Sequence, residues 1–223
     1  MFAGHLGVAL AAARVGPRVN VGVLAAAALL LDALLWLFVL LGWETVAIPA
    51  DFPQTHQPEF VFPFSHGLLA GLAWSALAGS CSIVLYKDRA GPRALTALLV
   101  GGVVFSHWLL DALVHRPELP LTGTGSPRVG VGLWDHMPLA LAIEGVLVIV
   151  GMFLFFPGCG LPRPKKVALA ALSVLVLAFT VAGMTVAPPP PSATAMAASS
   201  LCTIVLLCVL IGWIGRGARA GRA

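Results

Sequence analysis

Long apolar stretches alternate with short polar segments along the whole chain. A helix that crosses a membrane needs about 20 mostly apolar residues, and six stretches reach that length. They cover residues 19 to 42, 65 to 86, 94 to 115, 137 to 156, 167 to 187 and 195 to 214. Residues 1 to 13 are also apolar but are too few to cross a bilayer as a helix. The pattern predicts an all-α membrane bundle of six spanning helices and an N-terminal half-length helix.

The composition agrees with a membrane protein. Hydrophobic residues make up 59% of the chain and charged residues 10%, whereas a soluble domain has about 25% charged residues. No polar segment is longer than residues 43 to 64, which leaves no room for a second, hydrophilic module. We therefore expect a single transmembrane domain over residues 1 to 223. Residues 1 to 150 carry its motifs, and residues 151 to 223 add two packing helices.

Basic residues gather beside alternate ends of the predicted spans. Lys and Arg are retained on the cytoplasmic side of membrane proteins, and six spans place all the basic groups on one side. The groups are Arg14 and Arg18; Lys87, Arg89 and Arg93; Arg163, Lys165 and Lys166; and Arg216, Arg219 and Arg222. The net charge of +4 then follows from the topology and indicates no nucleic-acid partner. We expect a multi-pass protein whose C-terminus is cytoplasmic, because the last basic group lies there. The abundance of Ala, Gly, Val and Arg is typical of a bacterial inner membrane, and we expect the protein there.

Several ionisable residues lie inside or at the mouths of the predicted spans. A carboxylate at the centre of a bilayer costs about 2.5 to 3.5 kcal/mol, so it usually faces a partner or a watery cavity. From the rise per residue, the polar groups fall at compatible depths and can converge in one cavity that opens to the outer side. These residues are His5, Asp32, His66, His107, Asp111, His115 and Glu144.

The spacing on the third predicted span is the most informative. His107 and Asp111 are four residues apart and therefore neighbours on a helix, with His115 one turn further. Imidazole and carboxylate groups bind zinc, and also manganese or iron. Asp32 and His66 from other helices would complete a four-ligand shell. Taken singly, each residue is also explained as a helix-helix contact or an interfacial group; together, three helices that each bring a costly polar group favour a metal site.

Four motifs resemble a known family. They are "GHLGVAL" with His5, "LLLDALLW" with Asp32, "FSHGLL" with His66, and "FSHWLLDALVHRPELPL" with His107 and Asp111. These motifs, within residues 1 to about 150, resemble the bacterial membrane-bound metal-dependent hydrolases, and their order is similar to the ligand order of zinc-dependent phospholipase C. The resemblance implies that Asp32, His66, His107 and Asp111 hold one metal ion. It also implies that His5 belongs to another metal position that shares Asp111.

The chain departs from these patterns at three positions. The membrane family commonly has Pro before its Asp and a second acid two residues after it, whereas this chain has Leu31 and Leu34. The phospholipase pattern has a His four residues before its Glu, where this chain has Ala140 before Glu144. One possible ligand is therefore missing, and a third metal ion is not expected.

A bound divalent ion would determine the chemistry. Such an ion lowers the pKa of a bound water toward about 7 and polarises a phosphoryl oxygen. We expect a hydrolase of a lipid or lipid-linked phosphoester that works from the outer side of the membrane. Glu144 and His115 are the candidate catalytic residues, and Arg116 and Arg128 are candidates to bind a phosphate. Helix contact for Glu144 and interfacial anchoring for the arginines are the alternatives.

Two rival functions remain open. A carrier could use the same His and Asp residues as a proton or ion relay, but the only sign of a repeat is the likeness of residues 64 to 69 to residues 105 to 110. In an assembly protein, the polar groups would only set the register of the helices. The oligomeric state and the substrate are not predicted.

Overall fold

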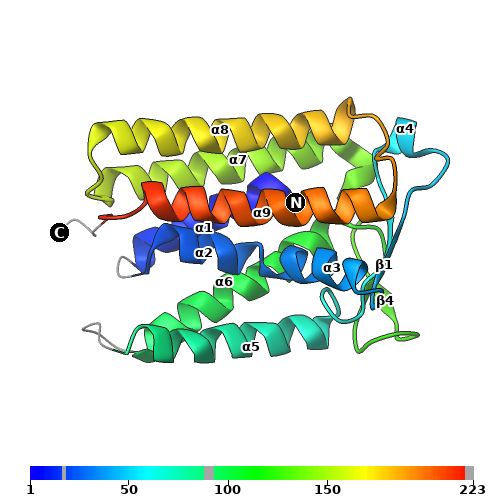
Figure 1. Ribbon diagram of the computed structural model, residues 1–223, viewed down its shortest axis with the longest axis horizontal. Helices are drawn as coiled ribbons and strands as arrows, with labels where there is room; N and C mark the ends of the chain where they lie inside the picture. The colour runs from blue at the N-terminus through cyan, green and yellow to red at the C-terminus, as the bar shows by residue number, and fades with distance from the viewer. Residues whose placement is uncertain (17–18, 88–92, 219–223) are drawn as a thin grey trace.

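The chain folds as a bundle of helices (Figure 1). The computed structural model describes residues 1–16, 19–87 and 93–218. Its principal helices are α1 (Phe2–Val15), α2 (Val21–Ala28), α3 (Leu30–Leu40), α5 (Leu68–Leu85), α6 (Arg93–Val114), α7 (Met137–Phe155), α8 (Arg163–Thr185) and α9 (Ala193–Ile214). Among the described residues, 5 helices are long and apolar enough to cross a membrane, or up to 6 if the pair of α2 and α3 is one span. The predicted all-α membrane bundle is confirmed.

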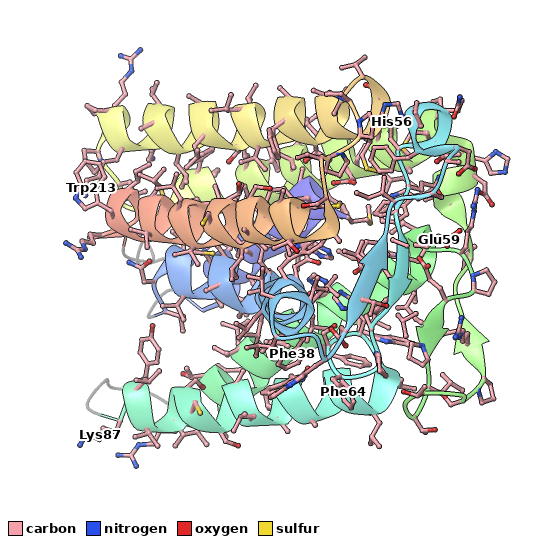
Figure 2. The ribbon with its side chains drawn as sticks, turned by 45° about the vertical axis from the view of Figure 1, so that its right-hand side comes forward. Phe38, His56, Glu59, Phe64, Lys87 and Trp213 are labelled. Atoms are coloured by element: carbon pink, nitrogen blue, oxygen red, sulfur yellow. The ribbon has the colours of Figure 1, made fainter. Side chains whose placement is uncertain are left out.

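The two ends of the bundle differ. One end carries the longer connections, with the short helix α4 (Phe52–Thr55), the 3-10 helix η1 (Leu133–His136) and two small antiparallel sheets, β1 (Thr45–Ala47) with β2 (Glu59–Val61) and β3 (Leu119–Pro120) with β4 (Arg128–Val129). The other end carries the 3-10 helix η2 (Phe156–Gly158) and the described members of the basic groups, which lie at or beside the ends of α1, α5, α6, α8 and α9. Figure 2 shows Lys87 at this basic end and Glu59 at the opposite end. Arg18, Arg89, Arg219 and Arg222 lie outside the described residues, and the orientation in a membrane stays a prediction.

The first predicted span is broken. We predicted one helix over residues 19 to 42, but α2 and α3 meet at Leu29 with a bend of 54°. The break places Asp32 in the first turn of α3, where the partial positive charge of a helix N-terminus stabilises a carboxylate. It also directs the carbonyl of Ala28 to His107 Nδ1, 2.6 Å away. The break therefore helps to build the polar site.

Helix α1 is a central element of the bundle. It is too short to span, and Ala3, Leu6 and Leu10 are fully buried. Two glycines allow its close approach to α7: a Cβ at Gly7 would lie 2.4 Å from the carbonyl oxygen of Leu147, and one at Gly151 would lie 2.2 Å from that of Gly7. Close backbone contact between small residues is typical of packed membrane helices. This packing holds His5 deep inside the bundle.

Candidate metal centre

Four of the predicted ligands meet in space. Asp32 from α3, His66 from the segment before α5, and His107 and Asp111 from α6 each offer one ligand atom, and these atoms all lie within 4.8 Å of one another. His66, His107 and Asp111 are buried, whereas the side chain of Asp32 is 19% exposed. The structure therefore contains a His/Asp cluster that can hold a metal ion, as predicted.

Five of the six separations within this cluster are close to the edges of a tetrahedron around a metal ion. His107 Nε2 lies 3.1 Å from Asp111 Oδ2 and 3.2 Å from His66 Nε2. His66 Nε2 lies 3.3 Å from Asp111 Oδ2. Asp32 Oδ1 lies 3.7 Å from His66 Nε2 and 3.6 Å from His107 Nε2. Four ligands at zinc-nitrogen and zinc-oxygen distances from a central ion are about 3.3 Å apart, so these five edges suit an ion of that size.

His107 presents an unprotonated nitrogen to the cluster. Its Nδ1 lies 2.6 Å from the carbonyl oxygen of Ala28, and a carbonyl oxygen can only accept a hydrogen bond. Nδ1 therefore carries the proton of the neutral ring. The lone pair of Nε2 points at Asp111 and His66, which is the tautomer that a metal-binding histidine needs.

His66 is held in the same tautomer by a chain of two residues. Glu44 Oε1 accepts the backbone N–H groups of Phe64 and Ser65, and Glu44 Oε2 accepts the hydroxyl of Ser65 at 2.7 Å. With its proton donated to Glu44, Ser65 Oγ accepts from His66 Nδ1 at 2.8 Å. Burial raises the pKa of the Glu44 carboxyl, while these three donors oppose the rise. Nε2 of His66 is thus left with a lone pair that faces His107.

These hydrogen bonds have one electrostatic consequence. If both rings are neutral in these tautomers, two imidazole lone pairs and two carboxylates face a common point with no donor hydrogen on the four ligand atoms. Buried acceptors that face one another without a proton or a cation between them are unfavourable. A cation would relieve this repulsion, so the cluster can serve as a cation site.

His5 lies beside this cluster. Its Nε2 is 3.2 Å from Asp111 Oδ1, the second oxygen of the same carboxylate, and its ring stacks on that of His107 with the centroids 3.8 Å apart. Nδ1 of His5 is buried with no hydrogen-bond partner among the described residues. The Met1 nitrogen also donates to Asp111 Oδ1, at 3.0 Å. A metal-binding role for His5 stays a prediction.

The two candidate catalytic residues have different surroundings. Glu144 is buried and its Oε2 accepts the backbone N–H of Gly4 at 3.1 Å, so it caps the first turn of α1. His115 follows the last residue of α6, with Nε2 3.8 Å from Asp111 Oδ2 and Nδ1 bonded to Glu118 Oε1. The geometry gives Glu144 a structural contact and directs His115 Nε2 toward the cluster. Their catalytic roles stay predictions.

The two arginines predicted to bind phosphate lie apart from the cluster. Arg116 is 54% exposed and its Nε donates to Asp135 Oδ1 at 2.8 Å. Arg128 is an exposed residue of β4. Neither is among the described residues that line the cavity beside the cluster. Binding of a phosphate by either arginine stays a prediction that the geometry does not favour.

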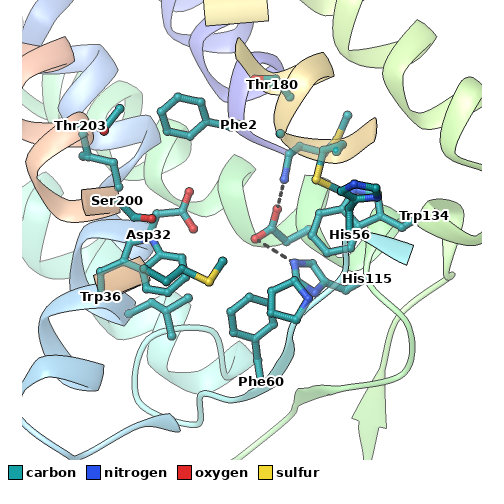
Figure 3. Close-up of a pocket in the computed structure, with 18 of the residues that line it drawn as sticks. Phe2, Asp32, Trp36, His56, Phe60, His115, Trp134, Thr180, Ser200 and Thr203 are labelled. Carbon is teal, nitrogen blue, oxygen red and sulfur yellow. Dashed lines mark hydrogen bonds and ion pairs between the residues drawn. The ribbon is translucent and has the colours of Figure 1, made fainter. Parts of the chain in front are cut away.

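A cavity of about 580 Å³ adjoins the cluster (Figure 3). Asp32, His66 and Asp111 line it together with His115 and Glu144. Figure 3 shows Asp32 on the same side as Ser200 and Thr203 of α9, with His115 and Phe60 across from them. Most of the other lining residues are apolar, from α1, α3, α8, α9 and the segment 52–62. The cluster therefore stands at one part of a largely apolar chamber.

Sequence analysis missed three residues that support the site. Glu44 and Ser65 orient His66, and Glu118 holds His115. Ser65 directly precedes His66, which was a usable signal, since a neighbouring hydroxyl can fix a histidine tautomer. Glu44 had no such signal, because it lies 21 residues away in the sequence.

Comparisons were made with known protein families, with curated proteins and with solved structures. The hydrolase resemblance of the motifs stays a prediction, and the geometry of the cluster is independent of it. None of the three comparisons finds a match for this chain.

Proposed function

We propose that this protein is a membrane-embedded, metal-dependent hydrolase of a lipid or lipid-linked phosphoester. The observation that carries the proposal is the set of two His and two Asp ligand atoms, all within 4.8 Å of one another and buried or half-buried. Intramembrane ionisable groups in such number are rare without a function. The motif resemblance to membrane-bound hydrolases points to the same activity.

Zinc is the metal that we propose. Two His and two Asp ligands also suit manganese or iron, but those ions usually take more ligands. The observed edges of 3.1 to 3.7 Å fit four ligands around one ion. Ala28 and the Glu44–Ser65 pair orient the two imidazoles, and such outer partners raise the basicity of metal-binding histidines.

Residues beside the cluster would carry out the proton transfer of the reaction. When bound, the ion would need a fifth position for a water, whose pKa it would lower, and would polarise the phosphoryl group. His115 faces Asp111 through Nε2 and lines the cavity, so it can take up or release a proton beside the reacting group. Glu118 Oε1 accepts a hydrogen bond from Nδ1–H of His115 and holds the ring in that orientation. The buried walls limit the access of bulk water.

The position of the cluster favours a substrate at the membrane surface. His66 lies just before α5 and Asp111 lies in the last turn of α6. The cluster therefore lies toward the end of the bundle opposite Lys87 (Figure 2), which is the outer end if the basic residues are cytoplasmic. A phosphoester at that depth would belong to a lipid headgroup. We therefore propose membrane lipid as the source of the substrate.

Elemental analysis of detergent-purified protein tests the proposal. We expect about one zinc ion per chain in the wild type and its loss in His107→Ala and Asp111→Asn. His136→Ala is the matched control, because His136 is exposed and does not line the cavity. The zinc-loaded protein is then tested on lipid phosphomonoesters and phosphodiesters. A folded wild type that stays empty after incubation with zinc would overturn the proposal in favour of a proton relay.

A further inference from the structure

The cavity beside the metal cluster extends away from it between two helices. Phe179, Gly183 and Met184 of α8 line it together with Met196 and Thr203 of α9. Because side chains of both helices border the same space, α8 and α9 do not close against each other along this stretch. Near the basic end they are joined by Lys165 Nζ, which donates to the carbonyl oxygen of Arg216 at 2.7 Å. The cavity-lining residues of both helices lie in the half of the bundle that contains the cluster.

The exposed part of the cavity wall lies on these two helices. Of the described lining residues, only Phe179 of α8 and Ser199 of α9 are exposed. The aromatic side chains of Phe52, Phe60 and Phe62 are buried and cover the cavity from the loop end. Both α8 and α9 are long and apolar enough to cross a membrane. A cavity that opens between two such helices opens toward lipid chains.

The chemistry of this opening suits a hydrocarbon chain. Phe179, Met184 and Met196 offer apolar surface, and methionine adapts its shape to flexible ligands. The hydroxyls of Thr180 and Thr203 donate to carbonyl oxygens of their own helices. They therefore need no hydrogen-bond acceptor on the ligand. A Cβ at Gly183 would meet nothing within 4 Å. This glycine leaves open space at the wall of the cavity.

We propose that the space between α8 and α9 is an acyl-chain site through which a lipid enters sideways from the bilayer. The chain would lie along Gly183 and Thr203, with the phosphoester of the headgroup at the His/Asp cluster. This inference rests on the proposed function for what happens to the headgroup, but binding of the chain can be measured without catalysis. It gives α8 and α9 a role in binding, beyond the packing role expected from the sequence.

Photolabelling in vesicles tests the site. The protein is reconstituted in phosphatidylcholine vesicles that contain a small fraction of phosphatidic acid with a diazirine in its acyl chain. After illumination, labelled residues are identified by mass spectrometry. We expect label on Met184 and Met196, which line the cavity. Leu175 and Leu206 are exposed on the outside of the same helices, so their labelling reports ordinary contact with the bilayer.

Blocking variants separate the cavity from the outer surface. Gly183→Trp fills the opening from α8, and Thr203→Trp fills it from α9. We expect either to reduce labelling of Met184 and Met196 about tenfold, because the chain loses its apolar contacts. The matched controls Ala182→Trp and Cys202→Trp place the same side chain at exposed neighbouring positions and should leave the labelling unchanged. Two blocking variants are made because the test needs only one of them to fold.

The outcomes distinguish this inference from the proposed function. Cavity labelling that both folded controls retain and a folded blocking variant loses supports the acyl-chain site, with or without zinc in the protein. Label on Leu175 and Leu206 alone, or cavity labelling that the Trp substitutions leave unchanged, overturns it. In that case a wild type that binds one zinc ion would still retain the metal centre.

Discussion

Nε2 of His66 and Nε2 of His107 lie 3.2 Å apart, and both rings have Nδ1 committed to an acceptor on the far side. Two neutral imidazoles cannot hydrogen-bond to each other when neither has a proton on the facing nitrogen. A cation bound between them would remove this conflict and would be shared with Asp32 and Asp111. These two histidines therefore form the centre of the proposed metal site.

Removal of the partner of Ser65 should weaken metal binding without removing a ligand. Glu44→Gln leaves His66 in place but substitutes an amide for the carboxylate that fixes the Ser65 hydroxyl. We expect a loss of about 10- to 100-fold in zinc affinity, as for other outer partners of metal-binding histidines. Competition with a chromophoric chelator measures it. Glu59→Gln, at an exposed carboxylate of β2, is the control, and equal affinities in the two variants would contradict the role of Glu44.

The close contact of α1 with α7 predicts a sharp difference between two glycines. Gly151→Ala would bring a Cβ to 2.2 Å from the carbonyl oxygen of Gly7, which forces the helices apart at a cost of about 1 to 3 kcal/mol. Gly102→Ala meets nothing within 4 Å and should stabilise α6 slightly, because alanine favours helix. Thermal unfolding in detergent compares the two. A Gly151→Ala protein as stable as Gly102→Ala would show that α1 packs differently.

His115 is expected to act in the reaction and not in metal binding. His115→Ala should lower kcat about 100-fold or more, as loss of a general acid or base does, and should keep the zinc. Glu118→Gln should lose less activity, since its amide oxygen can still accept a hydrogen bond from Nδ1–H of His115. The measurements are kcat on the lipid phosphoester that the wild type hydrolyses and the zinc content of each variant. Loss of zinc in His115→Ala would make His115 a ligand instead.

The distribution of charge predicts the topology. An impermeant maleimide should label Glu59→Cys in intact bacterial cells, and should label Lys87→Cys only after the membrane is opened, because basic ends stay in the cytoplasm. Both substitutions are made in a background without the four native cysteines. Labelling with the reverse pattern would show that the end with the cavity faces the cytoplasm.

Much of the fold was predictable because its signals are local. The length of an apolar stretch predicts a span wherever it occurs, and the four-residue spacing of His107 and Asp111 places both on one helix face. The break at Leu29 was not predictable, since "LLLDALL" contains neither Pro nor Gly. The partnership of Glu44 with Ser65 depends on how distant segments pack. The opening at Gly183 likewise depends on a neighbour, α9, that no local pattern identifies.

Zinc X-ray absorption of the purified, zinc-loaded protein tests the metal centre most directly. We expect only nitrogen and oxygen ligands at about 2.0 to 2.2 Å, from the four side chains and one water, with the scattering of two imidazoles. His66→Ala, if it still binds zinc, should lose one of those imidazoles. A shell without two imidazoles, or one with sulfur at about 2.3 Å, would contradict the assignment of Asp32, His66, His107 and Asp111 as the four ligands.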